Sequence, residues 1–249
     1  MAFVIKSGGL TTTGTTGADL FSIQSGAGGG TTVLGLAGND TVLATDGIAT
    51  ATALSIDAAG GADSISLSGS TMSGVSLVGG AGGDTITLAG ASYTKSNSFD
   101  AGNGNDSVDI DVASLSGTTL TFGGGADEIA LSGNDLDKAL IGAGSGADTI
   151  TLAGDLSMSA ASIIGGGGAD VFTIANAISG GVFINGDSSV NGGGADTISI
   201  LSNISGGSVF GKGGKDSITM SGVAGTGAQV LGGAGADTIT LASGIAGSA

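Results

Sequence analysis

The residues of this chain best suited to chemistry are aspartates that recur at nearly constant spacing. They are Asp19, Asp40, Asp63, Asp84, Asp106, Asp127, Asp148, Asp170, Asp196, Asp216 and Asp237. Successive members lie 21, 23, 21, 22, 21, 21, 22, 26, 20 and 21 residues apart. A carboxylate can bind a hard cation or accept hydrogen bonds from amides of its own turn. Histidine and cysteine are both absent, so the common nucleophile–base pairs cannot form and we expect no enzyme.

A glycine stands two positions before every one of these aspartates. The set is Gly17, Gly38, Gly61, Gly82, Gly104, Gly125, Gly146, Gly168, Gly194, Gly214 and Gly235. A position occupied by glycine in every copy of a repeat indicates a positive φ angle or a close approach of another backbone segment. Each aspartate is therefore predicted to end a tight glycine turn.

Apolar residues at fixed distances from the aspartates predict the strands that position these turns. Two positions after the aspartate come Phe21, Val42, Ile65, Ile86, Val108, Ile129, Ile150, Phe172, Ile198, Ile218 and Ile239. A second apolar column lies seven positions before it: Val33, Ile56, Leu77, Phe99, Leu120, Ile141, Ile163, Val209 and Val230. A looser third column comprises Met72, Tyr93, Leu115, Leu136, Ile178 and Ile204. Apolar residues that alternate with polar ones predict a strand with one buried face on each side of the turn.

A repeat this short cannot bury its apolar face alone, whereas stacked copies bury a continuous core. We predict an all-β fold, a right-handed parallel β-solenoid with about 11 coils of 21 or 22 residues. It is expected to form a single domain over residues 1–249, with an atypical first strand and coil in 1–18, regular coils in 19–241 and a tail in 242–249. The 26-residue spacing indicates an insertion around Asp187–Asn191, which we expect to bulge from one coil.

The composition limits the possible partners. The chain carries 21 acidic and 5 basic residues, a net charge of −16, which excludes a phosphate-tracking nucleic-acid surface and attraction to anionic lipid. No apolar run is long enough to insert into a membrane. The N-terminal residues lack the features of a secretory signal peptide. The 54 glycines are periodic, which argues against disorder.

The turns resemble a known family. Examples are Gly79-Gly80-Ala81-Gly82-Gly83-Asp84-Thr85-Ile86 and Gly232-Gly233-Ala234-Gly235-Ala236-Asp237-Thr238-Ile239. They are similar to the calcium-binding nonapeptide of the haemolysin-type, or RTX, repeat family. That resemblance implies Ca²⁺ held between coils by the eleven aspartates and by the turns of Gly38, Gly61, Gly82, Gly104, Gly125, Gly146, Gly168, Gly194 and Gly235. Unlike the family pattern, only one turn per coil carries the motif, so calcium is expected along one edge.

Several alternative interpretations stay open. One is that the aspartates only cap their turns, and another is that Lys212 and Lys215 supply positive charge in place of a cation near Asp216. Outward Thr-x-Thr pairs, such as Thr149/Thr151 and Thr238/Thr240, are similar to the face of ice-binding solenoids, although threonine also suits any exposed strand. Carboxylate pairs such as Asp109/Asp111 are expected to be solvated charges.

The expected function is structural. No catalytic domain and no polar cap are visible, and uncapped solenoid ends pair with further strands. We therefore expect calcium-dependent, head-to-tail assembly of identical copies into an extracellular filament or surface layer, in which Phe3-Val4-Ile5 docks on the last coil of the next copy. The family resemblance implies leaderless type I secretion to the surface of a Gram-negative bacterium, with cell-surface polysaccharide as a further candidate partner. The rival hypotheses are an ice-binding or adhesive module and a passive calcium-binding spacer.

Overall fold

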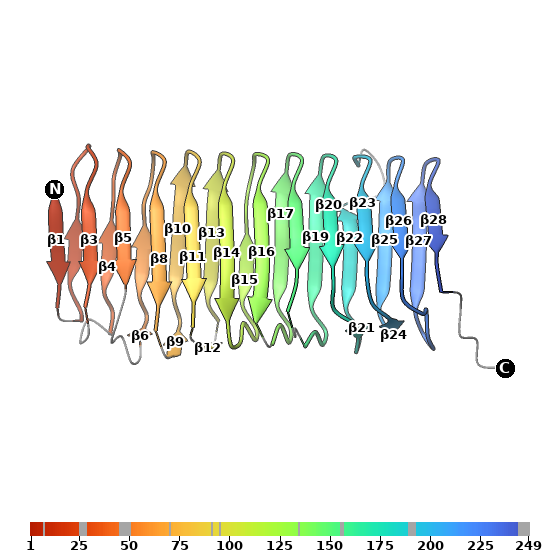
Figure 1. The fold of residues 1–249 in the computed structure, drawn as a ribbon. Helices are drawn as coiled ribbons and strands as arrows, with labels where there is room; N and C mark the ends of the chain where they lie inside the picture. The colour runs from red at the N-terminus through yellow and green to blue at the C-terminus, as the bar shows by residue number, and fades with distance from the viewer. Residues whose placement is uncertain are drawn as a thin grey trace. The chain divides into compact units, whose positions relative to one another are not determined.

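The computed structural model describes residues 1–6, 8–24, 29–44, 51–69, 71–90, 92–94, 96–133, 135–154, 157–188 and 193–243. These residues form two compact units, Met1–Gly123 and Gly124–Ala249. Within each unit, parallel strands lie side by side and one glycine turn per coil joins two of them (Figure 1). No helix occurs among the described residues, and hence none that could cross a membrane. The predicted fold class, an all-β right-handed parallel solenoid, is confirmed, whereas a single domain stays a prediction.

We call the strands that follow the aspartates the A sheet and those that precede the glycine turns the B sheet. In the first unit the A sheet has the order β1 (Ala2–Ile5), β3 (Leu20–Ile23), β5 (Thr41–Ala44), β8 (Ser64–Ser68), β11 (Thr85–Ala89) and β14 (Ser107–Val112). Its B sheet has the order β2 (Thr11–Thr13), β4 (Thr32–Leu34), β7 (Ser55–Asp57), β10 (Ser76–Ala81), β13 (Ser98–Asn103) and β15 (Thr119–Thr121). A short third sheet contains β6 (Ala51–Thr52), β9 (Thr71–Ser73) and β12 (Ser92–Thr94).

The second unit repeats this arrangement. Its A sheet has the order β16 (Glu128–Gly133), β18 (Thr149–Leu152), β20 (Val171–Ile174), β23 (Thr197–Ile200), β26 (Ser217–Met220) and β28 (Thr238–Leu241). Its B sheet has the order β17 (Leu140–Ser145), β19 (Ser162–Gly167), β22 (Phe183–Asp187), β25 (Ser208–Gly213) and β27 (Gln229–Ala234). The third sheet consists of β21 (Ile178–Ser179) and β24 (Ile204–Ser205).

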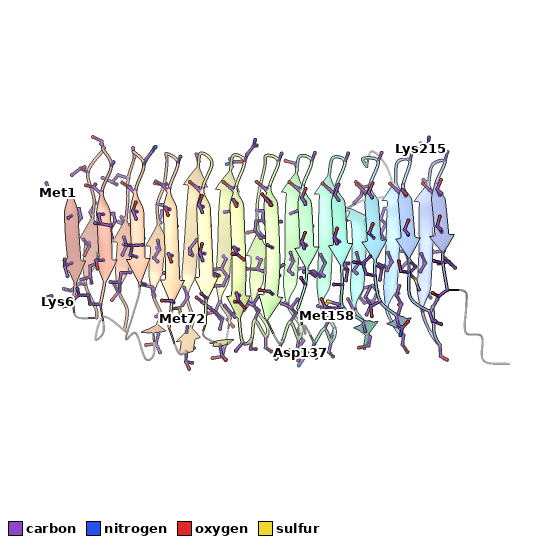
Figure 2. The ribbon with its side chains drawn as sticks, viewed as in Figure 1. Met1, Lys6, Met72, Asp137, Met158 and Lys215 are labelled. Atoms are coloured by element: carbon purple, nitrogen blue, oxygen red, sulfur yellow. The ribbon has the colours of Figure 1, made fainter. Side chains whose placement is uncertain are left out.

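The core of each unit is a thin layer between the A and B sheets, because every strand turns one face inward. The apolar column two positions after the aspartate is buried from Phe21 to Ile218, with exposed fractions of 0–4%. Ile239 in β28 belongs to the same column but is 42% exposed, since the described residues place no further strand beside it. The third column is also buried, and Met72 lies at the end of its unit opposite the glycine turns (Figure 2).

In the coil that leads to Asp196, where the spacing is 26 residues, counting along the sequence does not identify the buried residue of the B strand. Counting seven positions back from Asp196 reaches Ser189, which lies outside the described residues. The structure places Ile184 in that column instead, paired with Ile163 on one side and Val209 on the other. The additional residues therefore follow the B strand, between Asp187 and Gly193, and the core column stays continuous.

Candidate functional site

The aspartates lie at the inner side of the turns that connect the two sheets. From Asp19 to Asp216 they are at most 4% exposed, whereas Asp237, in the coil of β28, is partly exposed. The residue after the aspartate begins an A-sheet strand. Its N–H donates a hydrogen bond to the carbonyl oxygen of the aspartate in the preceding coil, as Thr41 does to Asp19 (2.8 Å). This ladder holds successive carboxylates of a unit in one column.

Nine of the carboxylates accept a hydrogen bond from the aspartate N–H of the preceding coil. Oδ1 of Asp40 accepts the backbone N–H of Asp19 (2.8 Å), and Oδ1 of Asp84 accepts that of Asp63 (2.8 Å). The second unit repeats the bond, for example from the N–H of Asp170 to Oδ1 of Asp196 (2.9 Å). The aspartates therefore join neighbouring coils, rather than capping only their own turn.

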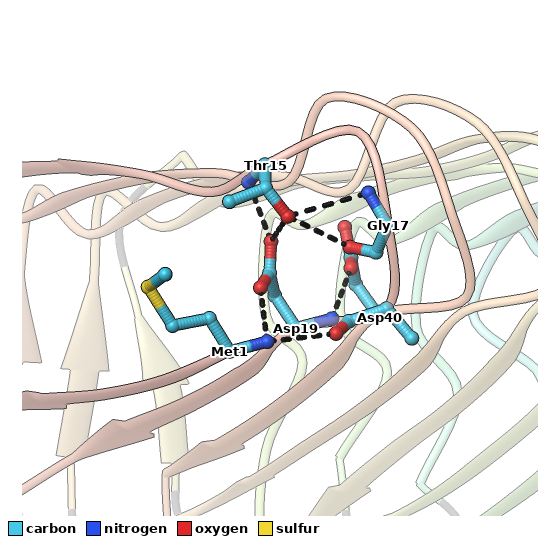
Figure 3. A network of polar contacts seen from close by, with 6 residues as sticks. Met1, Thr15, Gly17, Asp19 and Asp40 are labelled. Carbon is cyan, nitrogen blue, oxygen red and sulfur yellow. Dashed lines mark hydrogen bonds and ion pairs between the residues drawn. The ribbon is translucent and has the colours of Figure 1, made fainter.

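Asp19 has a different partner (Figure 3). Its Oδ1 accepts a hydrogen bond from the ammonium group of Met1 (2.5 Å), which occupies the place of an aspartate N–H in the other coils. Its Oδ2 accepts the backbone N–H of Thr15 (2.5 Å) and the hydroxyl of Thr15 (2.9 Å). The bond from the ammonium group is the main reason that the pKa of Asp19 is lowered.

The second carboxylate oxygen of many other aspartates has no such partner. Oδ2 is buried without a hydrogen-bond partner in Asp40, Asp63, Asp84, Asp148, Asp170, Asp196 and Asp216. A buried polar atom without a partner is costly. These oxygens are therefore the atoms of the turns that are free to accept a further hydrogen bond or to bind a cation.

Five of the seven unpartnered oxygens, those of Asp40, Asp84, Asp170, Asp196 and Asp216, face a main-chain carbonyl across a glycine. A Cβ atom added to Gly35 would lie 2.4 Å from Oδ2 of Asp40 and 2.6 Å from the carbonyl oxygen of Ala58 in the next coil. At Gly165 the same distances are 2.3 Å to Oδ2 of Asp170 and 2.4 Å to the carbonyl oxygen of Gly186. A small residue at this position therefore leaves a carboxylate and a carbonyl oxygen facing one narrow space.

Burial also changes the ionisation of the column, because loss of hydration disfavours a charged carboxylate. It raises the pKa of Asp84 and Asp170 to about 6 and that of Asp196 to about 7, and neighbouring aspartates add repulsion. The same cause raises the pKa of Asp40, Asp63, Asp106, Asp148, Asp187 and Asp216. A cation bound beside these carboxylates would favour their ionised forms and offset the repulsion between them.

The glycines two positions before the aspartates form the outer part of the turn. Nine have positive φ angles between 109° and 145°: Gly38, Gly61, Gly82, Gly104, Gly125, Gly146, Gly168, Gly214 and Gly235. A Cβ on Gly194 would lie 1.5 Å from the carbonyl oxygen of Gly168, so close approach alone requires glycine there. Gly17 meets neither condition. The sequence-based reason for glycine thus holds in every coil but that of Gly17.

Asp187 is a buried carboxylate that sequence analysis missed. It is 1% exposed, and its side chain accepts the N–H groups of Gly194 (3.1 Å) and Gly213 (3.3 Å). It takes the place of Gly166 in the neighbouring strand. Alignment of the B strands, rather than counting from Asp196, would have identified this position.

The two lysines near Asp216 do not contact its carboxylate as ion-pair partners in the described part of the chain. Among the described residues neither Lys212 nor Lys215 forms an ion pair with an aspartate. The Lys212 ammonium lies 4.9 Å from the centroid of the Phe210 ring, and Lys215 lies at the turn end of its unit (Figure 2).

Side chains alone would supply only some of the oxygen ligands that a hard cation needs here. No group of three or more Asp, Glu, His or Cys side chains that could hold a metal ion occurs in the described part of the chain. Calcium takes six to eight oxygen ligands and accepts main-chain carbonyls. A cation here would therefore use one or two of the stacked carboxylates together with carbonyl oxygens of the glycine turns, and the unpartnered Oδ2 atoms suit that role.

Comparisons with protein-family models, curated proteins and solved structures found no match to this chain. The resemblance of its turns to the RTX nonapeptide stays a prediction.

Proposed function

We propose that this chain is a non-catalytic structural protein whose copies assemble end to end, with calcium in the glycine turns, into an extracellular filament or surface layer. The observation that carries the proposal is the open edge of β28. Ile239 is 42% exposed there, although Ile218, in the same column one coil earlier, is fully buried. An apolar edge strand with unpaired backbone groups is a template for a further strand.

The proposed partner of β28 is β1 of the next copy. The N–H groups of Thr238 and Ala242 bond to the preceding coil, so those of Ile239 and Leu241 point to the open side. In β1, Phe3 and Ile5 align with the core residues Phe21 and Ile23. Docking of β1 on β28 in that register would cover Ile239 with Phe3 and continue the core.

Calcium would stabilise the coils of each copy before that copy joins the assembly. The ligands that we propose are the Oδ2 atoms of the buried aspartates and the carbonyl oxygens of the adjacent glycine turns. The cation would offset the repulsion along the column. Millimolar calcium outside cells can fill sites too weak to be occupied in the cytoplasm.

The test is negative-stain electron microscopy of the purified chain in calcium and in excess chelator. We expect filaments or layers in calcium and their loss with chelator, and Ile239→Lys should abolish end-to-end growth. Val171→Lys is the matched control, because Val171 is 40% exposed but lies on the outer face of β20. Assemblies that survive chelator would refute the calcium part, and growth of the Ile239→Lys variant would refute the end-to-end part.

A second candidate function rests on the outer face of the A sheet in the second unit. The strand register places Thr151, Thr173, Ser199, Thr219 and Thr240 side by side in one row. A regular hydroxyl row of this kind is compatible with an ice-binding module. Thermal hysteresis of the monomeric chain would support this alternative, and its absence would exclude it.

A further inference from the structure

The outer face of the B sheet differs between the two units. In the first unit, adjacent strands place Leu34, Asp57, Val78, Asp100 and Thr121 side by side. All are at least partly exposed. Val78 is therefore an apolar side chain between two carboxylates.

The corresponding row in the second unit carries no charge, and Asn185 is its only polar side chain. Adjacent strands place Gly142, Ile164, Asn185, Phe210 and Leu231 side by side. Phe183, on the same face, is 48% exposed and Leu231 is 54% exposed. The only acidic residue on these five strands is Asp187, which is 1% exposed, so this face carries no exposed carboxylate in a chain of net charge −16.

A pocket with a positive charge opens on this apolar face. It has a volume of about 250 Å³ and is lined by Phe210, Lys212, Leu231, Gly232 and Gly233. The Lys212 ammonium lies over the Phe210 ring and forms no ion pair among the described residues. An apolar side chain with a neighbouring carboxylate fits this combination.

We propose that the B-sheet face of the second unit binds the B-sheet face of the first unit of another copy, with Val78 in the pocket and Asp57 or Asp100 beside Lys212. Both faces are parallel sheets with the same strand spacing of about 4.8 Å, so their rows can match over several strands. Sheets that pack face to face interdigitate their side chains. Opposite charges on the two faces favour this pairing over contacts between identical faces.

The inference rests on the proposed self-assembly and adds its lateral contact. An interface between two different faces leaves one face of each kind free on the outermost copies, so it can add further copies unless the contacts close into a ring. Combined with end-to-end contacts, it would extend a filament sideways into a layer.

Cysteine cross-linking tests the proposal directly, because the chain contains no cysteine of its own. Full-length Val78→Cys and Leu231→Cys chains are mixed and oxidised. We expect the mixed Val78–Leu231 disulfide to form at least tenfold faster than either homodimer. A predominant Leu231 homodimer would show contact between identical faces, and equal rates would show random collision; either result overturns the proposal. Leu201→Cys is the matched control, since Leu201 is also 54% exposed but lies outside this face.

Charge reversal provides a second test. Lys212→Asp should weaken lateral association about tenfold, a change of about 1.4 kcal/mol, and Asp57→Lys with Asp100→Lys in the same chain should restore it. Aspartate tolerates the positive φ angle of 83° at this position better than most residues do. Lack of restoration in a variant with unchanged circular dichroism would contradict the pairing.

The end-to-end contact and the lateral contact can be separated. In the Ile239→Lys background, the Val78–Leu231 disulfide should still form although filaments do not. If wild-type filaments form but the mixed disulfide does not, the lateral contact is wrong and end-to-end assembly stands. If the disulfide forms but the wild-type chain never makes filaments, end-to-end assembly is wrong and the lateral contact stands.

Discussion

Two adjacent glycines give the sharpest test of how the turns stack. Gly168 has a φ angle of 132°, and a Cβ atom added to it would lie 1.6 Å from the carbonyl oxygen of Gly146. Gly167 has no positive φ angle, and no atom lies within 4 Å of its added Cβ. Alanine in place of Gly168 therefore requires the neighbouring coil to move, whereas alanine in place of Gly167 is accommodated.

The expected magnitude follows from these contacts. Strain at a glycine-only backbone conformation costs about 1–3 kcal/mol. Relieving the overlap requires the coils to separate, which weakens bonds such as that from the N–H of Gly146 to the carbonyl of Gly167 (2.7 Å), each contributing about 0.5–1.5 kcal/mol. Gly168→Ala should thus lower the free energy of unfolding by about 3–5 kcal/mol. Gly167→Ala should change it by less than about 1 kcal/mol, in the stabilising direction if the unfolded chain loses entropy.

Urea denaturation followed by circular dichroism measures the difference, with both variants in chelator so that cation binding plays no part. Because coils of a solenoid can open locally, hydrogen exchange should also show the loss of protection around Gly146 and Gly168 in the Gly168→Ala variant. Equal unfolding midpoints for the two variants would refute the stacking argument.

Further predictions concern buried polar groups. In the metal-free chain, the folded-state pKa of Asp84, Asp170 and Asp196 is raised from 3.8 to about 6, 6 and 7. Their protonated forms therefore stabilise the folded state fully below about pH 4, and this contribution decreases as the pH rises from about 4 to about 7, where it is lost. Urea midpoints in chelator should fall over that range, and midpoints constant from pH 4 to 8 would contradict the assignment. Asp84→Asn keeps an acceptor for the N–H of Asp63, whereas Asp84→Ala removes it, so Ala should be less stable than Asn by about 1–3 kcal/mol in urea denaturation at pH 8; equal stability would show that the bond contributes little. Tyr93→Phe removes a buried hydroxyl without a hydrogen-bond partner and should leave the unfolding midpoint unchanged or raise it; a loss above about 1 kcal/mol would reveal a missing partner.

The sequence identified the residues of the candidate site but not the hydrogen bonds that they form. The aspartates and glycines were recognisable because each repeats at a fixed distance from an apolar column. The partner of each Oδ1 was not, since the amide of the preceding aspartate lies 20–26 residues away in the chain. Asp187 was missed because the additional residues after it shift the count from Asp196, and because one of its donors, Gly213, is brought to it by stacking of coils.

The period, the two strands of each coil and the inward-facing side chains follow from the sequence alone, because they depend on local alternation and on the requirement to stack identical units. That Ile184 continues the core column past the insertion is visible only in the folded chain. The same holds for the position of Val78 between Asp57 and Asp100 and for that of Phe210 beside Leu231. These neighbours lie 21 or 22 residues apart. Their contact depends on the register between strands, which is a property of the stacked coils and not of any one repeat.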